Sequence, residues 1–222
     1  MGMVSTKSCI ALAKMAEQAG ADGISVLQPM FLKPTEDELY AHFKAIANAV
    51  PNLPMLLYNN PGRVGYTMSG NLVERLAREV NNIVGIKDSS GDMTQTEEFI
   101  RRTQDLDFKV FGGKDTLIYA TLAHGGVGAV CTTANYMPDL VVSVYNAYLE
   151  GNPQQALEYQ FKLNPIRLSM DKASFPVATK DMANMLHMDV GIPIRPSLPT
   201  TEGSPAYVLM QNELEKAGLL KH

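Results

Sequence analysis

The stretch IVGIKDSSGDMTQTEEFIRRTQDLDFKVFGG, residues 83–113, decides the fold. It begins with the apolar run IVGIKD and ends with a second short apolar run, FKVFGG at 108–113. Between them, apolar residues recur at helical spacing near 94–104. A strand, a helix and another strand in this order make a unit in which a helical crossover joins two parallel strands.

The same unit repeats along much of the chain. The runs expected to form strands end 20 to 31 residues apart and lie at 23–28, 53–59, 83–88, 108–113 and 126–133. The helices expected to follow them lie at 36–49, 69–79, 94–104, 117–125 and 138–151. The strands are apolar throughout, which is typical of strands that are covered on both faces. The sequence therefore predicts an α/β fold with a parallel sheet, either a barrel or a doubly wound sheet.

The two ends of the chain depart from this repeat. A helix is expected over 5–19, with Ser5 or Thr6 as its N-cap, and no strand precedes it. After Gly151 the strand pattern stops, and the expected elements are helices at 153–171, 176–188 and about 205–217. We therefore expect two parts: a partial (β/α) barrel over 1–151 and a C-terminal helical extension over 152–222, packed as one unit.

Composition excludes several classes of partner. With a net charge of -4 and 19% charged residues, the chain offers no basic field for nucleic acid. No apolar run reaches the roughly 20 residues that span a bilayer, so we expect no membrane. The histidines lack metal-ligand spacing, so no metal site is expected. Cys9 and Cys131 form no CxxC pair and fit buried thiols in a reducing, cytoplasmic protein.

Lys87 carries the strongest chemical signal, because it ends the strand IVGIKD. Active-site residues of parallel barrels lie at the C-terminal ends of the strands. An apolar surrounding disfavours an ammonium ion, and a neutral lysine amine is a nucleophile toward ketones. The alternative is that Lys87 only snorkels to solvent or forms a salt bridge.

Two further residues follow the preceding strand. Tyr58 ends that strand, so it is expected beside Lys87, where its phenol could exchange protons; the alternative is a tyrosine that only packs. Arg63 follows in a Pro-Gly loop and has a planar group that suits a carboxylate, unless it is simply an exposed loop arginine. Gly112 and Gly113 permit a close backbone approach at a later strand end. The GVGAVC segment lacks the third glycine of a dinucleotide-binding loop.

These motifs together resemble the dihydrodipicolinate synthase/N-acetylneuraminate lyase family of pyruvate-dependent class I aldolases. The resemblance is colinear over essentially the whole chain and rests on LYNNPGRVG, GIKDSSGD, VFGGKD and GAVCTTAN, with GADGISVLQP before them and GIPIRPSLP after them. It implies an eight-stranded barrel with a C-terminal helical extension, assembled as a homodimer or homotetramer.

The resemblance also implies roles for individual residues. Lys87 would form an imine with pyruvate, so no separate cofactor is needed, and Tyr58 would shuttle protons. The Val130 carbonyl would orient the substrate, and Gly113 and Asn59 would stand at substrate-binding positions. Arg63 matches the arginine that holds the carboxylate of aspartate semialdehyde in the synthase branch, which serves lysine biosynthesis. A small aldehyde or keto acid is therefore expected as the second substrate.

Two departures from the family pattern leave alternatives open. Phe31 stands where the synthases carry a relay tyrosine, so it either packs or marks a branch with another aldehyde, such as a lyase of N-acetylneuraminate or of a sugar acid. The first two βα units, the third strand and the Thr-Thr-Gly-Glu loop of the family are missing. We therefore expect unpaired strand edges, and a truncated, non-catalytic remnant is a further alternative.

Overall fold

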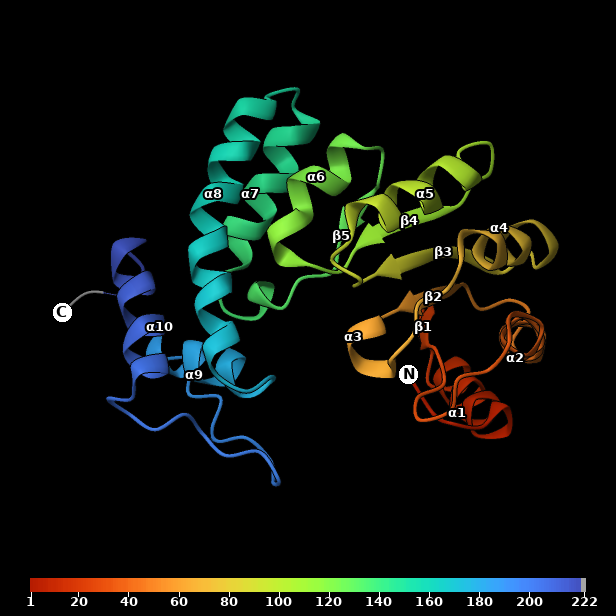
Figure 1. Cartoon of the computed structure of the whole chain (residues 1–222), viewed down its shortest axis with the longest axis horizontal. Helices are drawn as coiled ribbons and strands as arrows, with labels where there is room; N and C mark the ends of the chain where they lie inside the picture. Colours follow the sequence, from red (N-terminus) through yellow and green to blue (C-terminus); the bar gives the residue numbers. More distant parts are fainter. Residues whose placement is uncertain (221–222) are drawn as a thin grey trace. The chain divides into compact units, whose positions relative to one another are not determined.

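The structure, a computed structural model, describes residues 1–220 (Figure 1). The chain divides into two compact units. The first comprises residues 1–114 and 120–130, and the second comprises 115–119 and the chain from 131 onward. Residues 131–151 thus belong to the second unit, although we assigned them to the barrel part. That the two parts pack as one unit stays a prediction.

The first unit contains a parallel sheet of five strands in the order β1-β2-β3-β4-β5. The predicted α/β fold with a parallel sheet is confirmed, and neighbours in the chain are neighbours in the sheet. The last strand is shorter than expected, because the chain leaves the sheet after the Val130 N–H donates to the Gly112 oxygen at 2.8 Å. The strands are β1 (Ile24–Leu27), β2 (Met55–Asn59), β3 (Ile83–Asp88), β4 (Lys109–Gly112) and β5 (Gly128–Ala129).

Helices follow the strands of this unit, and a side chain at the N-cap position accepts a backbone hydrogen bond in most of them. The Thr35 hydroxyl accepts from the Glu38 N–H while the Glu38 carboxylate accepts from the Thr35 N–H, a capping box. Ser5, Ser69 and Asp92 cap three further helices. The helices are α1 (Thr6–Gln18), α2 (Glu36–Ala49), α3 (Pro61–Val64), α4 (Gly70–Glu79), α5 (Met93–Thr103) and, across the division of the units, α6 (Ile118–Ala123).

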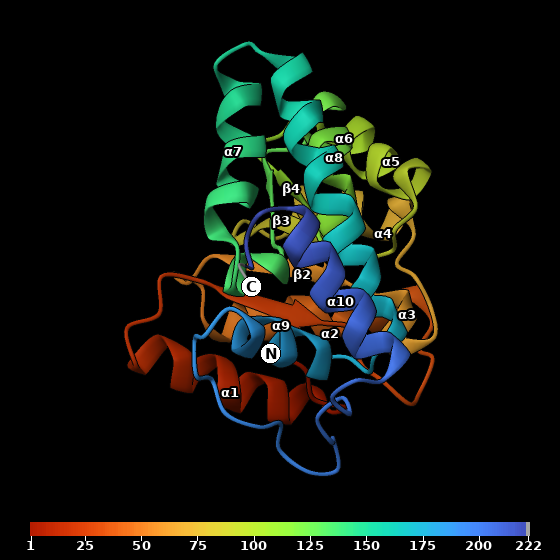
Figure 2. The same ribbon diagram turned by 90° about the vertical axis from the view of Figure 1, so that its left-hand side faces the viewer.

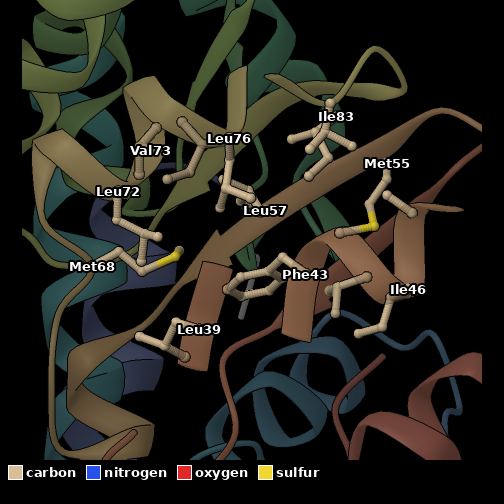
Figure 3. Packing of buried hydrophobic residues seen from close by; sticks show 14 of the residues in the cluster. Leu39, Phe43, Ile46, Met55, Leu57, Met68, Leu72, Val73, Leu76 and Ile83 are labelled. Carbon is tan, nitrogen blue, oxygen red and sulfur yellow. The ribbon is translucent and has the colours of Figure 1, made fainter. Parts of the chain in front are cut away.

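The apolar core lies between the sheet and the helices α1, α2, α4 and α5, which run along one side of it (Figure 1). Phe43 and Ile46 of α2 point toward Met55 and Leu57 of β2 (Figure 3). All four are fully buried. At about 1.5–3 kcal/mol for each large apolar side chain, this burial holds the helices on the sheet.

A register shift in β3 decides which side chains face away from these helices. Met55 pairs with Ile83, but Leu56 pairs with Gly85, so β3 contains one extra residue, Val84. The bulge reverses the alternation of β3, and Tyr58 therefore pairs with Lys87. In an unbroken register, the lysine would instead lie on the face that the helices cover.

The β1 edge of the sheet is paired with Met1, which differs from the unpaired edges predicted from the sequence; for the β5 edge this stays a prediction. The Met1 amino group donates to the Ser25 oxygen, and the Met1 oxygen accepts from the Leu27 N–H at 2.8 Å. Two bonds from one residue to both neighbours of Val26 form the pattern of a parallel ladder.

The second unit is helical, as predicted for the C-terminal part. The helices α7 and α8 lie side by side, and α10 packs on α8 (Figure 2). Cys131 is only partly buried, so the prediction of two buried thiols is wrong for this residue and right for Cys9. The elements are η1 (Asp115–Leu117), η2 (Thr133–Asn135), α7 (Pro138–Leu149), α8 (Pro153–Ser169), η3 (Met170–Lys172), α9 (Val177–Met185) and α10 (Pro205–Lys216). Over residues 1–220, no helix combines the length and apolar character required to cross a membrane.

The bulge predicts a strict requirement for glycine at position 85. A Cβ atom on Gly85 would lie 2.3 Å from the Lys109 oxygen and 2.9 Å from the Leu56 side chain. We expect Gly85→Ala to lower the free energy of unfolding by about 1–3 kcal/mol through overpacking. Urea unfolding measures this, with Gly62→Ala as the control because its Cβ would make only ordinary contacts. Equal unfolding midpoints for the two variants would contradict the close approach.

Candidate active site

Side chains from neighbouring strands form one row across the face of the sheet that is opposite the core. The strand register aligns Leu27, Tyr58, Lys87, Phe111 and Gly128 in this row. The row lies at the C-terminal ends of the strands, where parallel α/β folds place their active sites. Lys87 therefore stands between an aromatic neighbour on each side.

Lys87 and Tyr58 contact each other. The Lys87 Nζ atom lies 4.2 Å from the centroid of the Tyr58 ring, and both side chains are half-buried. A cation or an amine over the face of a phenol ring is a favourable contact. The structure thus brings together the two residues that the sequence singled out, with the amine directed at its neighbour along the sheet.

The environment of Tyr58 favours loss of its proton. Burial raises the pKa of this phenol, but a hydrogen bond with Ser89, the charge of Lys87 and hydrogen bonds with Asn60 and Lys87 outweigh it. The net effect is a pKa below the ordinary value of tyrosine. The donor in the contact with Asn60 is the side-chain amide, whose Nδ2 lies 2.9 Å from the phenol oxygen. Such a tyrosine exchanges protons more readily than an exposed one.

The loop after β2, which carries Arg63, is pinned to the end of β1. The buried Gln28 accepts from the Asn60 N–H at 3.0 Å and donates to the Tyr66 oxygen at 3.2 Å. Burial raises the pKa of Tyr66 to about 12, and its hydroxyl donates to the Pro29 oxygen at 2.6 Å. Arg63 lies in the last turn of α3, a helix that we had expected to be a loop, and it is exposed.

Gly113 allows a close backbone approach, as predicted, and the segment that approaches it is the end of β3. The Gly113 N–H donates to the Asp88 oxygen at 2.7 Å. A Cβ atom there would lie 2.0 Å from the Ser89 hydroxyl. Val130 follows β5 in the same unit, and its side chain is exposed. The role of its carbonyl, like substrate binding by Gly113, stays a prediction.

Asn59 lies on the opposite face from Tyr58 and is fully buried. Its Nδ2 donates to the Asp88 carboxylate at 2.8 Å, and its Oδ1 accepts from the Met68 N–H at 3.0 Å. Asp88 also accepts from the side chains of Ser90 and Thr96. The contacts of Asn59 lie in β3 and in the loop after β2, and substrate binding by this residue stays a prediction.

Phe31 does not pack within the first unit. Its side chain is 94% exposed, and its backbone has φ 76°, in the left-handed region. Of the two alternatives given for this residue, internal packing is therefore excluded among the described residues. Phenylalanine has no hydroxyl group, so Phe31 itself has no proton to relay.

Sequence reasoning missed three residues that hold the site: Gln28, Asn60 and Ser89. Each is a polar residue at, or one or two positions after, the end of an apolar strand. That signal was available in the sequence, but Gln28 and Ser89 have partners that are distant in the sequence. Only the register of the sheet reveals them.

A half-buried lysine against a tyrosine of lowered pKa can act as an amine nucleophile with a proton donor beside it. All six residues predicted for the site lie in the first unit. Among residues 1–220, no cluster of three or more His, Cys, Asp or Glu side chains could hold a metal ion. This geometry defines a strand-end lysine site on a parallel α/β sheet.

Comparison with known proteins agrees with this class. The sequence profile of the Dihydrodipicolinate synthetase family matches residues 1–212. The 4-hydroxy-tetrahydrodipicolinate synthase of Methanopyrus kandleri is 36% identical over 219 residues, which cover 99% of this chain and 72% of that protein. The synthase of Archaeoglobus fulgidus is 37% identical over 201 residues, which cover 90% of this chain and 68% of that protein.

Solved structures of dihydrodipicolinate synthases also match this chain. Dihydrodipicolinate synthase from Thermotoga maritima matches with a TM-score of 0.93 and 31% identity, over 99% of this chain and 74% of that one. The synthase from Acinetobacter baumannii, solved in complex with pyruvate, matches with a TM-score of 0.92 and 32% identity, over 99% and 74% of the two chains. The chain belongs to the dihydrodipicolinate synthetase family.

The buried contacts of Asn59 predict that this residue supports the fold. We expect Asn59→Ala to lower the free energy of unfolding by more than about 2 kcal/mol, because Asp88 and the Met68 N–H lose a buried partner. Urea unfolding measures this, with the exposed Asn52→Ala as the control. A variant of normal stability with weakened pyruvate binding would instead identify Asn59 as a substrate ligand.

Proposed function

We propose that this chain is a pyruvate-dependent lyase that forms a Schiff base through Lys87, with the reaction of a 4-hydroxy-tetrahydrodipicolinate synthase. The pairing of Lys87 with Tyr58 carries the proposal: Nζ lies 4.2 Å from the ring centroid, at the C-terminal edge of the sheet. The curated relatives that carry the synthase name are 33–37% identical, and two solved relatives were crystallised in complex with pyruvate.

The first half of the reaction uses both residues. In its unprotonated form, the Lys87 amine attacks the ketone carbon of pyruvate and gives a carbinolamine. Tyr58 donates its proton to the carbinolamine hydroxyl, which leaves as water, and the nitrogen becomes part of an iminium ion. The Tyr58 phenolate then removes a proton from the methyl carbon, which yields the enamine and restores the phenol.

The second half forms the carbon–carbon bond. The enamine carbon adds to the carbonyl carbon of a small aldehyde, whose oxygen takes the proton of Tyr58, and the nitrogen becomes part of an iminium ion again. Water, or an amino group of the new chain, then attacks the iminium carbon, gives a proton to the Tyr58 phenolate and displaces the Lys87 amine. Arg63 follows Tyr58 on a pinned loop, so it suits the carboxylate of an acidic aldehyde such as aspartate semialdehyde. No cofactor enters this scheme, because the imine itself withdraws the electrons.

A sugar-acid aldolase is the second candidate, because the exposed Phe31 supplies no hydroxyl to a relay. Substrate profiling separates the two candidates. Consumption of aspartate semialdehyde with pyruvate supports the synthase, whereas release of pyruvate from a sugar acid or from N-acetylneuraminate supports the aldolase. We further propose that the active protein has the eight-stranded barrel of the family and assembles as a homodimer or homotetramer.

Borohydride trapping tests the lyase against a non-catalytic remnant. With pyruvate and borohydride, we expect a reduced adduct on the peptide that contains Lys87, and none in Lys87→Met. Lys109→Met is the matched control, because this lysine lies at the beginning of the neighbouring strand β4. Mass spectrometry of the digested protein measures the adduct. A folded chain that gains no adduct would identify a remnant.

The lowered pKa of Tyr58 predicts the alkaline side of the pH profile. Because Tyr58 donates its proton only as the phenol, the rate of imine formation should fall as pH rises through a pKa below about 10. In Tyr58→Phe the rate should be roughly 10²–10⁴-fold lower, without this alkaline limb. Tyr159→Phe, in the second unit, is the control. A wild-type rate in Tyr58→Phe would exclude the phenol as the proton donor.

A further inference from the structure

Asn60 has three hydrogen-bond roles at once in the loop after β2. Its side-chain Nδ2 donates to the Tyr58 phenol oxygen at 2.9 Å. Its backbone N–H donates to the buried Gln28, and its carbonyl oxygen accepts from the N–H groups of Arg63 and Val64 at 3.0 and 3.2 Å. The residue is thus the junction between the phenol, the end of β1 and the short helix α3.

The phenol oxygen has a second polar neighbour in Ser89. Ser89 is buried, hydrogen-bonds with Tyr58 and donates from its hydroxyl to the Gly113 oxygen at 3.2 Å. The Ser89 hydroxyl is thus shared between the phenol and the backbone of the residue that follows β4, whereas the Asn60 Nδ2 donates directly to the phenol oxygen. The charged group that acts on Tyr58 is Lys87; burial and, after it, the charge of Lys87 also lower the pKa of the Met1 amino group.

We propose that Asn60 is a positioning residue for Tyr58, which fixes the phenol beside the Lys87 amine and links it to the loop that carries Arg63. The inference rests on the proposed function, because it concerns the step in which Tyr58 gives its proton to the departing hydroxyl. At that step negative charge develops on the phenol oxygen, and an amide N–H at 2.9 Å stabilises it.

The link also couples the two substrate positions. The carbonyl of Asn60 accepts the first hydrogen bonds of α3, the short helix in which Arg63 lies. A substrate carboxylate that moves the Arg63 backbone therefore also moves Asn60, which holds the Tyr58 phenol. A substrate with a carboxylate would therefore influence proton transfer at Tyr58 without touching it. The loop 60–65 is the connection between the two residues.

Direct titration of Tyr58 tests this link. Tyrosine labelled with 13C at Cζ reports each phenol by NMR, and Tyr58→Phe assigns the signal among the 9 tyrosines. In Asn60→Leu we expect the pKa of Tyr58 to rise by about half a unit to one unit, because a donor to the phenolate is lost. In Asn60→Asp, which has the same shape, it should rise further because the two negative charges repel each other. The exposed Asn81→Leu is the matched control and should leave the titration unchanged.

The pH profile of pyruvate trapping is the second readout. Its alkaline limb should move upward with the titration in both variants of Asn60, while unfolding curves stay close to wild type. Suppose that the wild-type chain and both Asn60 variants trap pyruvate, but the titration of Tyr58 and the alkaline limb stay unchanged in the variants. That result would overturn the link and leave the proposed function standing. A titration that moves in a chain that traps no pyruvate supports the contact and overturns the proposed function.

Discussion

The register between β2 and β3 is the constraint on which the site depends. The extra residue Val84 changes the phase of β3, and without it Lys87 would face the buried helices instead of Tyr58. The bulge fits because Gly85 has no Cβ, which leaves room for the Lys109 carbonyl of β4. One backbone irregularity thus determines whether an amine and a phenol meet. The chemistry proposed for this chain follows from that meeting.

The two faces of β2 and β3 carry different kinds of side chains. On one face lie Tyr58 and Lys87, both half-buried. On the other, Asn59 and Asp88 form a buried polar network with the loop after β2 and with Thr96 of α5. A buried polar network is rigid only when all its members are satisfied. It holds the strand ends in register, while the reactive pair remains accessible.

Much of the fold and the central pair could be predicted from the sequence. Strand ends 20 to 31 residues apart, with helical periodicity between them, predicted parallel strands and put Tyr58 and Lys87 at neighbouring strand ends. The extra residue Val84, which puts both side chains on the same face, could not be predicted. Hydrogen bonds between distant residues could not be predicted. Gln28 reaches across to Asn60 and Tyr66 because of a register that no local pattern encodes. The alternation of side chains along β2 does put Asn59 opposite Tyr58, but its buried partners come from other segments.

A crystal structure of this chain after soaking with pyruvate tests the central claim most directly. The account predicts continuous electron density between the Lys87 Nζ atom and the C2 carbon of pyruvate. It also predicts the Tyr58 oxygen within hydrogen-bonding distance, about 3 Å, of the adduct. An unmodified Lys87 that points into solvent, or an adduct on another lysine, would contradict it.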